Sequence, residues 1–153
     1  PTSHQYFFFS KVIQKGLNIM NIINCDVAFR GKSISTGEWV YGVPVSNSRK
    51  TCIVRLNDSD ELKSVQVIPE TVGQFTGFYD QKGNGICVDD IILYRNIRNI
   101  HGNMILQVKW TGYFGMFTAE SDRPIKVVQL SNINRKVEII GNIHDNHEWL
   151  ENV

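Results

Sequence analysis

The side chains that could form a nucleophilic site in this chain are its cysteines and histidines. A cysteine thiolate beside an imidazole base is a common arrangement for covalent catalysis. The candidates for such a pair are Cys25, Cys52, Cys87, His101, His144 and His147. No local signature surrounds any of them, and no Cys-x-x-Cys pair occurs. We therefore predict no catalytic residue, and we interpret the cysteines as small buried hydrophobic residues in a reducing compartment.

A metal site is the second chemistry that the sequence suggests. His144 and His147 lie three residues apart, beside Asp145 and Glu148. On a helix this spacing would place both imidazoles on one face. However, His144 is expected at the end of a strand and His147 on a following helical turn, and no third ligand stands at a recognised spacing. We interpret these residues as polar cap residues and predict no metal and no cofactor.

Asp89 and Asp90 are adjacent carboxylates at the expected start of a strand. Adjacent strand residues point to opposite faces, so this pair is poorly placed for shared acid–base chemistry. We favour a turn role for Asp89 and a hydrogen bond between the Asp90 side chain and the backbone. The glycines of residues 73–85 match neither a Walker phosphate loop nor a GxGxxG run, and they predict tight turns.

Trp110, Tyr113, Phe114 and Phe117 form the most prominent aromatic cluster of the sequence. The alternation of a half-buried strand must place one set of side chains in the core. We therefore expect Trp110, Phe114 and Phe117 to be core residues, with Tyr113 facing away from Phe114.

Small β-barrels also bind peptides or single-stranded nucleic acid through exposed aromatic rings and neighbouring basic side chains. The candidate interaction surface of this chain is therefore Tyr113 with Lys109, Arg123 and Lys126. A nucleic-acid-binding surface would need an exposed aromatic on one face together with the basic residues Lys109, Arg123, Lys126, Arg135 and Lys136.

The composition limits the classes of partner. The formal net charge is +1, from 16 basic and 15 acidic residues, whereas a dedicated nucleic-acid-binding protein usually has a clear basic excess. No apolar stretch reaches the roughly 18 residues of a membrane-spanning helix, so we expect no membrane partner. With 42% hydrophobic and 20% charged residues, the chain can build a buried core.

Short apolar stretches separated by turn-forming residues must position these candidate side chains. Alanine, the best helix former, occurs only at Ala28 and Ala119, which favours strands over helices. The strands that we expect are residues 26–30, 38–45, 51–56, 65–68, 74–79, 86–94, 104–110, 113–118, 125–130 and 137–144, followed by a helical turn within 146–152.

This pattern predicts a mainly β fold. We expect a small N-terminal antiparallel sheet and a C-terminal five-stranded SH3-like β-barrel, because closure of a meander removes its exposed edges. The predicted divisions of the chain are residues 1–19, 20–71 and 72–153. Residues 1–19 are expected to be a leader or an expression-derived segment, because Met20 follows Lys15 and Gly16, whose codons can spell a ribosome-binding sequence.

Three blocks of the sequence, in the same order, resemble the YopX family. The first block contains FRGK at residues 29–32 and GEWVYG at 37–42. The second runs from VIPETVGQFTG at 67–77 through FYD to the turn at Gly83, and the third is EIIGNIHDNHEWL at 138–150. Together the blocks span about residues 27–152 of the chain.

One position departs from the family pattern. The family usually has Glu-Gly-Asp-Ile-Val where this chain has Val88-Asp89-Asp90-Ile91-Ile92, so that Asp89 replaces a glycine. If that glycine takes a positive φ, aspartate tolerates the conformation better than most residues do. The departure therefore bears on the local turn and not on the fold.

The resemblance implies a mainly β protein encoded by a bacteriophage, a prophage or another bacterial mobile element, and no enzymatic activity, cofactor or substrate comes with it. Our leading hypothesis is a non-enzymatic protein-interaction module in the cytoplasm of a bacterial host. Its expected partner is a protein that the sequence does not identify, with a second copy of the chain as one candidate. The alternatives are a nucleic-acid-binding small β-barrel and, with the least support, a metal-dependent hydrolase with a site near His144.

Overall fold

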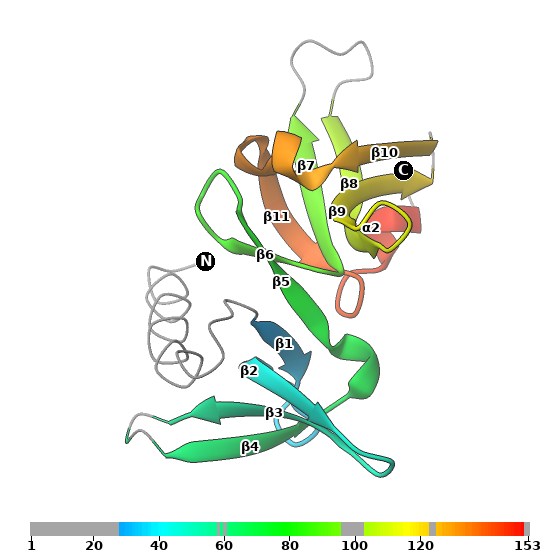
Figure 1. Ribbon diagram of the computed structural model, residues 1–153. Helices are drawn as coiled ribbons and strands as arrows, with labels where there is room; N and C mark the ends of the chain where they lie inside the picture. The colour runs from blue at the N-terminus through cyan, green and yellow to red at the C-terminus, as the bar shows by residue number, and fades with distance from the viewer. Residues whose placement is uncertain (1–27, 58, 60, 96–102, 123–124, 152–153) are drawn as a thin grey trace. The chain divides into compact units, whose positions relative to one another are not determined.

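The computed structural model describes residues 28–57, 59, 61–95, 103–122 and 125–151. Antiparallel strands dominate these residues, with three 3₁₀ turns and one short helix (Figure 1). The mainly β fold predicted from the sequence is therefore confirmed. The predicted leader at residues 1–19 lies outside the described residues.

The chain divides into two compact units, Pro1–Gly77 and Phe78–Val153. The division falls within strand β5 (Gly73–Tyr79), directly after Gly77. Gly77 has a φ of +79°, a left-handed conformation that glycine adopts without steric cost. The subdomain boundary expected between residues 71 and 72 lies slightly earlier in the chain.

The strands of the first unit form an antiparallel sheet in the order β4-β3-β2-β1-β5. At the end of this order, β6 is hydrogen-bonded to β5. The other strands of the first unit are β1 (Phe29–Lys32), β2 (Trp39–Ser46), β3 (Thr51–Leu56) and β4 (Leu62–Val67). The 3₁₀ turn Pro69–Thr71 leads from β4 into β5. The predicted strands of this region are all present, and β4 begins three residues earlier than expected.

The sheet of the first unit curls so that the end of β4 returns to the segment after β1. Ser33 bridges Val67, and the N–H of Ile68 donates to the carbonyl of Lys32 at 2.9 Å. Val67 is fully buried and lies close to Gly31, where an added Cβ would be 3.0 Å from its side chain, so Val67 would have to shift to admit one. The resulting core consists of Val40, Ile53 and Val67, with Phe29, Val65 and Val72 against it.

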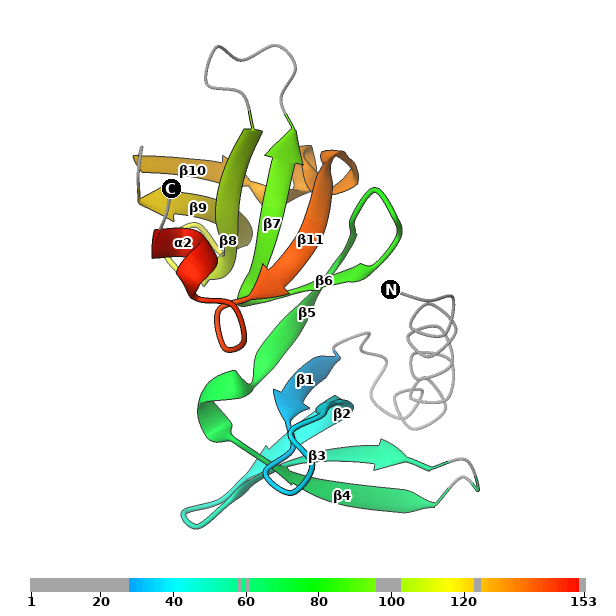
Figure 2. The same cartoon turned by 180° about the vertical axis from the view of Figure 1, so that it is seen from behind.

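The second unit holds a five-stranded antiparallel sheet in the order β10-β9-β8-β7-β11. Figure 2 shows β8, β7 and β11 side by side, with the short helix next to β8. The elements of this unit are β6 (Gly85–Cys87), β7 (Asp90–Arg95), β8 (Asn103–Thr111), β9 (Met116–Asp122), β10 (Ile125–Gln129), β11 (Val137–Asn142), α2 (Glu148–Glu151) and the 3₁₀ turns Leu130–Asn132 and Asn134–Lys136.

Strand alternation builds the core of the second unit. Met104, Leu106 and Val108 point to one face of β8 and are buried. The register places Ile92 opposite Leu106 and Ala119 opposite Val108, so the same face continues across β7 and β9. The five predicted strands are therefore present, but the strand expected over residues 113–118 begins at Met116 and ends at Asp122. In the described residues no ladder joins β10 to β11, so the predicted closure into an SH3-like barrel is not confirmed.

The strand expected over residues 86–94 is interrupted, because a turn at Val88 and Asp89 separates β6 from β7. Asp89 has a φ of +69°, and among the described residues it alone is a non-glycine residue with positive φ. The Asp90 carboxylate accepts a hydrogen bond from the N–H of Cys87 at 2.7 Å. The turn role predicted for Asp89 and the hydrogen bond to the backbone predicted for Asp90 are therefore confirmed.

The side chain of Asp80, only 4% exposed, links the turn between β5 and β6 to β11. Its Oδ1 accepts the backbone N–H groups of Lys82 and Asn84 at 2.9 and 2.8 Å. Its Oδ2 accepts the Asn84 side-chain amide at 3.1 Å and the Ile139 N–H at 3.2 Å. These four donors satisfy a carboxylate that would otherwise be costly to bury.

We expect Asp80→Ala to lower the free energy of unfolding by about 2–3 kcal/mol, because it leaves backbone N–H groups without an acceptor. Urea unfolding at neutral pH measures this change. Glu70→Ala, which removes an exposed carboxylate, is the control and should cost less than about 0.5 kcal/mol. Equal losses in the two variants would contradict the assigned role of Asp80.

A second matched pair of substitutions tests the backbone at Asp89. Asp89→Gly and Asp89→Ala both remove the carboxylate, but only alanine retains the steric cost of positive φ. We expect the glycine variant to be more stable than the alanine variant by about 1 kcal/mol. Thermal or urea unfolding of the two proteins gives the difference, and equal stabilities would mean that Asp89 does not hold this conformation.

Candidate functional site

The hairpin of β8 and β9 ends in a group of exposed aromatic residues, Trp110, Tyr113 and Phe114, which we call the aromatic tip. Their exposed fractions are 53%, 92% and 55%, respectively. The turn is ordered by hydrogen bonds from the N–H of Phe114 to the carbonyl of Thr111 and from the N–H of Gly115 to the carbonyl of Gly112. Two of these exposed aromatic side chains, Tyr113 and Phe114, thus lie on a hydrogen-bonded turn, and the third, Trp110, lies at the end of β8.

Phe117 anchors the aromatic tip to the core. It lies opposite Trp110 in the ladder, and their ring centroids are 4.9 Å apart in an edge-to-face contact. Phe117 in turn packs against the buried core of the second unit. Tyr113 and Phe114 form a second edge-to-face pair, with centroids 5.0 Å apart. Such ring pairs each contribute about 0.5–1.5 kcal/mol beyond area burial, so the tip is supported by its own contacts.

The expectation that Trp110 and Phe114 belong to the core is wrong, whereas Phe117 does pack against it. Trp110 shares the face of β8 that carries Val108, as the alternation predicted, but it lies beyond the end of the buried core. Phe114 lies in the turn, outside both strands. Alternation identifies the face of a residue but does not indicate where along the strand the core ends.

The opposite face of the same hairpin carries a polar network. The Thr118 hydroxyl lies 2.8 Å from Glu120 Oε1, and the Thr111 hydroxyl lies 2.6 Å from that of Thr118. Because each hydroxyl has one proton, the arrangement that uses the shortest contacts is a chain in which Thr111 donates to Thr118 and Thr118 donates to Glu120. The Lys109 ammonium completes the network 3.2 Å from the other oxygen of Glu120.

This network lowers the pKa of Glu120. Burial alone would raise the pKa, but the hydrogen bond from Thr118, together with the hydrogen bond and the positive charge of Lys109, outweighs it. A carboxylate whose pKa is lower in the folded state stabilises the fold at pH values above its unfolded pKa. That contribution is lost as the pH falls through the folded pKa.

We expect Glu120→Gln to destabilise the protein at neutral pH by about 1 kcal/mol, because it removes the charge that Lys109 and Thr118 contact. The difference from the unsubstituted protein should shrink as the pH falls below the usual range of a glutamate carboxyl group. Urea unfolding across that pH range measures it. A difference that does not depend on pH would show that the Glu120 charge has no part in stability.

The structure does not bring the predicted interaction residues onto one face. Tyr113 is at the aromatic tip, and Lys109 is engaged with Glu120. Lys109 lies opposite Thr118 and Lys126 lies opposite Ser121, so the register places the two lysines on opposite faces of the sheet. Arg123 lies outside the described residues.

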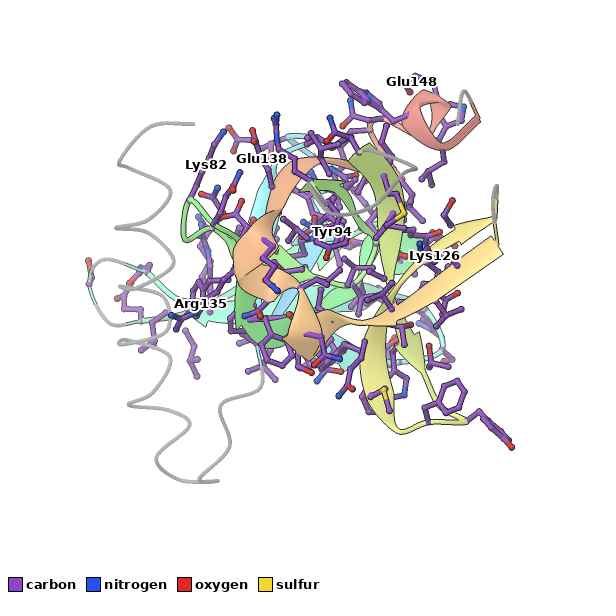
Figure 3. The ribbon with its side chains drawn as sticks, turned by 90° about the horizontal axis from the view of Figure 1, so that it is seen from above. Lys82, Tyr94, Lys126, Arg135, Glu138 and Glu148 are labelled. Atoms are coloured by element: carbon purple, nitrogen blue, oxygen red, sulfur yellow. The ribbon has the colours of Figure 1, made fainter. Side chains whose placement is uncertain are left out.

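The remaining basic side chains of the second unit are distributed around it. Lys82 and Arg95 both pair with Glu138, whose pKa they lower, chiefly through the hydrogen bond from Lys82. Figure 3 shows Arg135 and Lys126 on different sides of the unit. The described residues therefore present no single basic face beside the aromatic tip.

His144 is placed differently from the expected solvated cap. Its side chain is 16% exposed, and its Nε2 lies 3.5 Å from the carboxylate of Asp89, which also accepts a hydrogen bond from Gln107 at 3.0 Å. His147 instead lies beside Glu148 at 3.8 Å and is largely exposed. Sequence reasoning missed the contact of His144 with Asp89, because nothing in the local spacing signals a contact between such distant positions.

The other chemistry-bearing residues do not converge. Cys52 is buried in the first unit and Cys87 in the second. Cys25 and His101 lie outside the described residues. In the part of the chain that the structure describes, no group of three or more His, Cys, Asp or Glu side chains could hold a metal ion. No helix of that part is long and apolar enough to cross a membrane.

The fold and the aromatic tip define an all-β protein of two antiparallel units with an exposed aromatic hairpin. A family profile described as "YopX protein" matches residues 28–151 of the chain. The chain therefore belongs to the YopX family, and the resemblance read from the three sequence blocks is confirmed.

The chain is similar to protein EF1440 from Enterococcus faecalis, a crystal structure, with 21% sequence identity and a TM-score of 0.49. The similarity covers 81% of this chain and 97% of that one. Among curated proteins, no match to this chain is found.

Proposed function

We propose that this YopX-family protein is a non-enzymatic interaction module that binds a partner protein through its aromatic tip. The observation that carries the proposal is the exposure of Tyr113, at 92%, in edge-to-face contact with Phe114 on the hairpin that also exposes Trp110. Contiguous exposed apolar groups on an ordered element mark interaction sites more often than accidental exposure.

The physical properties of the aromatic tip suit protein recognition. Tyrosine and tryptophan are enriched among the residues that contribute most to binding at protein interfaces. Burying one large apolar side chain contributes about 1.5–3 kcal/mol. Because the contact with Phe117 and the hydrogen-bonded turn already restrict the tip, little further ordering is needed on binding, and more of this energy is available for affinity.

A protein partner is better supported than a nucleic acid. Lys109, the basic residue closest in sequence to the tip, has its ammonium beside Glu120, which compensates its charge. A nucleic-acid surface would join aromatic stacking to uncompensated positive charge.

We further propose that the second unit approaches an SH3-like barrel and that the protein acts in the cytoplasm of a bacterial host, as a phage or prophage product. The barrel is supported by the pairing of β11 with β7, because a meander that curls on itself brings its last strand beside its first. The setting is supported by membership of the YopX family.

Affinity capture from host cells tests the proposed function. The tagged protein and the variants Tyr113→Ala, Trp110→Ala and Trp149→Ala are compared at equal concentration. Trp149 is also exposed but belongs to α2, so its variant is the matched control. We expect the two tip variants to recover about tenfold less of the partner protein, the effect of losing about 1.4 kcal/mol, and Trp149→Ala to recover as much as the unsubstituted protein.

Two results of this experiment would contradict the proposal. One is recovery of nucleic acid with no partner protein, released by salt, which would favour the nucleic-acid alternative. The other is equal recovery of the partner by tip variants that remain folded, as judged by thermal unfolding.

A further inference from the structure

The two edge strands of the five-stranded sheet, β11 and β10, differ in the hydrogen bonding of their outward backbone N–H and C=O groups. The outer edge of β11 is bonded within the unit, because the N–H of Gln81 donates to Val137 at 3.0 Å and the N–H of Ile139 donates to Asp80. Among the described residues, no backbone hydrogen bond reaches the outer edge of β10. An edge strand in this condition is a template for another strand.

The pairing pattern identifies the free groups on β10. In antiparallel sheets the N–H and C=O of one residue point to the same side, and successive residues alternate between sides. The carbonyl of Val137 points away from β7, since it accepts from the N–H of Gln81. Its neighbour Glu138 must then point toward β7, and the same alternation can be followed from strand to strand. The pairs whose backbone groups face each other are Glu138 with Leu93, Ile92 with Leu106, Gln107 with Glu120, and Ala119 with Val128.

It follows that Val127 and Gln129 direct their N–H and C=O groups away from β9. An independent contact agrees with this assignment, because the N–H of Asp89 donates to the carbonyl of Val108, which must therefore point to the β7 side of β8. Val127 also exposes 53% of its surface at the centre of β10. Among the residues that the structure describes, the edge thus combines backbone groups without a backbone partner with an exposed apolar side chain.

We propose that β10 pairs antiparallel with β10 of a second copy of this chain, about a twofold axis at Val127. Val127 is the middle residue of the five-residue strand Ile125–Gln129, so this register overlaps the two strands completely. It places Val127 opposite itself as a hydrogen-bonded pair and buries both exposed side chains. The contact is isologous and therefore closes at two copies.

Lys126 explains why the partner is a second copy in this one register. A lysine on an edge strand normally discourages pairing with other edges. In the proposed register Lys126 lies opposite Val128 of the partner subunit, so its aliphatic stem covers an apolar residue and its charge has no like charge opposite. A shift that centres the pair on Lys126 would put two lysines directly opposite each other, which is destabilising.

This surface is separate from the aromatic tip. Val127 lies opposite Glu120 in the ladder, so its side chain is on the face of the sheet opposite to the one that carries Trp110 and Phe117. Self-pairing through β10 therefore goes beyond the proposed function, and it would give each dimer two aromatic tips.

The oligomeric state tests the proposal. We expect the protein to be a dimer by size-exclusion chromatography with light scattering, and Val127→Lys to be a monomer, because the substitution sets two positive charges opposite each other at the axis. Val45→Lys is the matched control, since Val45 is a strand valine with 55% exposure in the first unit, and it should remain a dimer. Tyr113→Ala should also remain a dimer.

Amide hydrogen exchange gives a second measurement that does not depend on any variant folding. The amides of Val127 and Gln129 should exchange more slowly as protein concentration rises, because pairing supplies their acceptors. The amide of Val128, which faces β9, should not change. A monomer at all concentrations, a dimer that survives Val127→Lys, or a dimer lost in Tyr113→Ala would overturn the proposal.

Discussion

The buried carboxylate of Asp80 is the contact on which the second unit depends. It accepts four hydrogen bonds, three from the turn between β5 and β6 and one from β11, and so joins segments that are 59 residues apart in the chain. The hydrogen bond from Ile139 to Asp80 and the one from the N–H of Gln81 to the carbonyl of Val137 also give partners to backbone groups on the outer edge of β11. The sheet is consequently left with one unpaired edge in the described residues, that of β10, and with one long hairpin, β8–β9, that carries the aromatic tip.

The aromatic tip is held from both faces of its hairpin. On the core face, Phe117 packs into the buried cluster and supports Trp110 edge to face. On the other face, Lys109, Glu120 and the two threonine hydroxyls link β8 to β9 across the ladder. Exposed aromatic rings on a loose loop would lose much of their binding energy to ordering, whereas rings on a supported hairpin retain it. This difference is the physical reason for treating the tip as a contact surface.

The sequence predicted local structure better than long-range placement. Alternating apolar residues and turn formers located the strands, and Asp89, which stands where the family has a glycine, does have a positive φ. The exposure of Trp110 was missed because periodicity carries no information about where the core ends. The roles of Asp80 toward Ile139 and of Asp89 toward His144 were missed because each joins positions more than fifty residues apart. Such contacts follow from the completed topology and not from local pattern.

The central claim is that the aromatic tip is exposed and ordered in solution, and fluorine NMR of protein labelled with 5-fluorotryptophan tests it most directly. The Trp110 signal is assigned with Trp110→Phe, and Trp39, which is half-buried with Arg30 4.6 Å from its ring, provides an internal reference. The account predicts one sharp Trp110 resonance whose shift between H₂O and D₂O is larger than that of Trp39. A Trp110 resonance with no solvent-dependent shift would place this ring in the core and contradict the account.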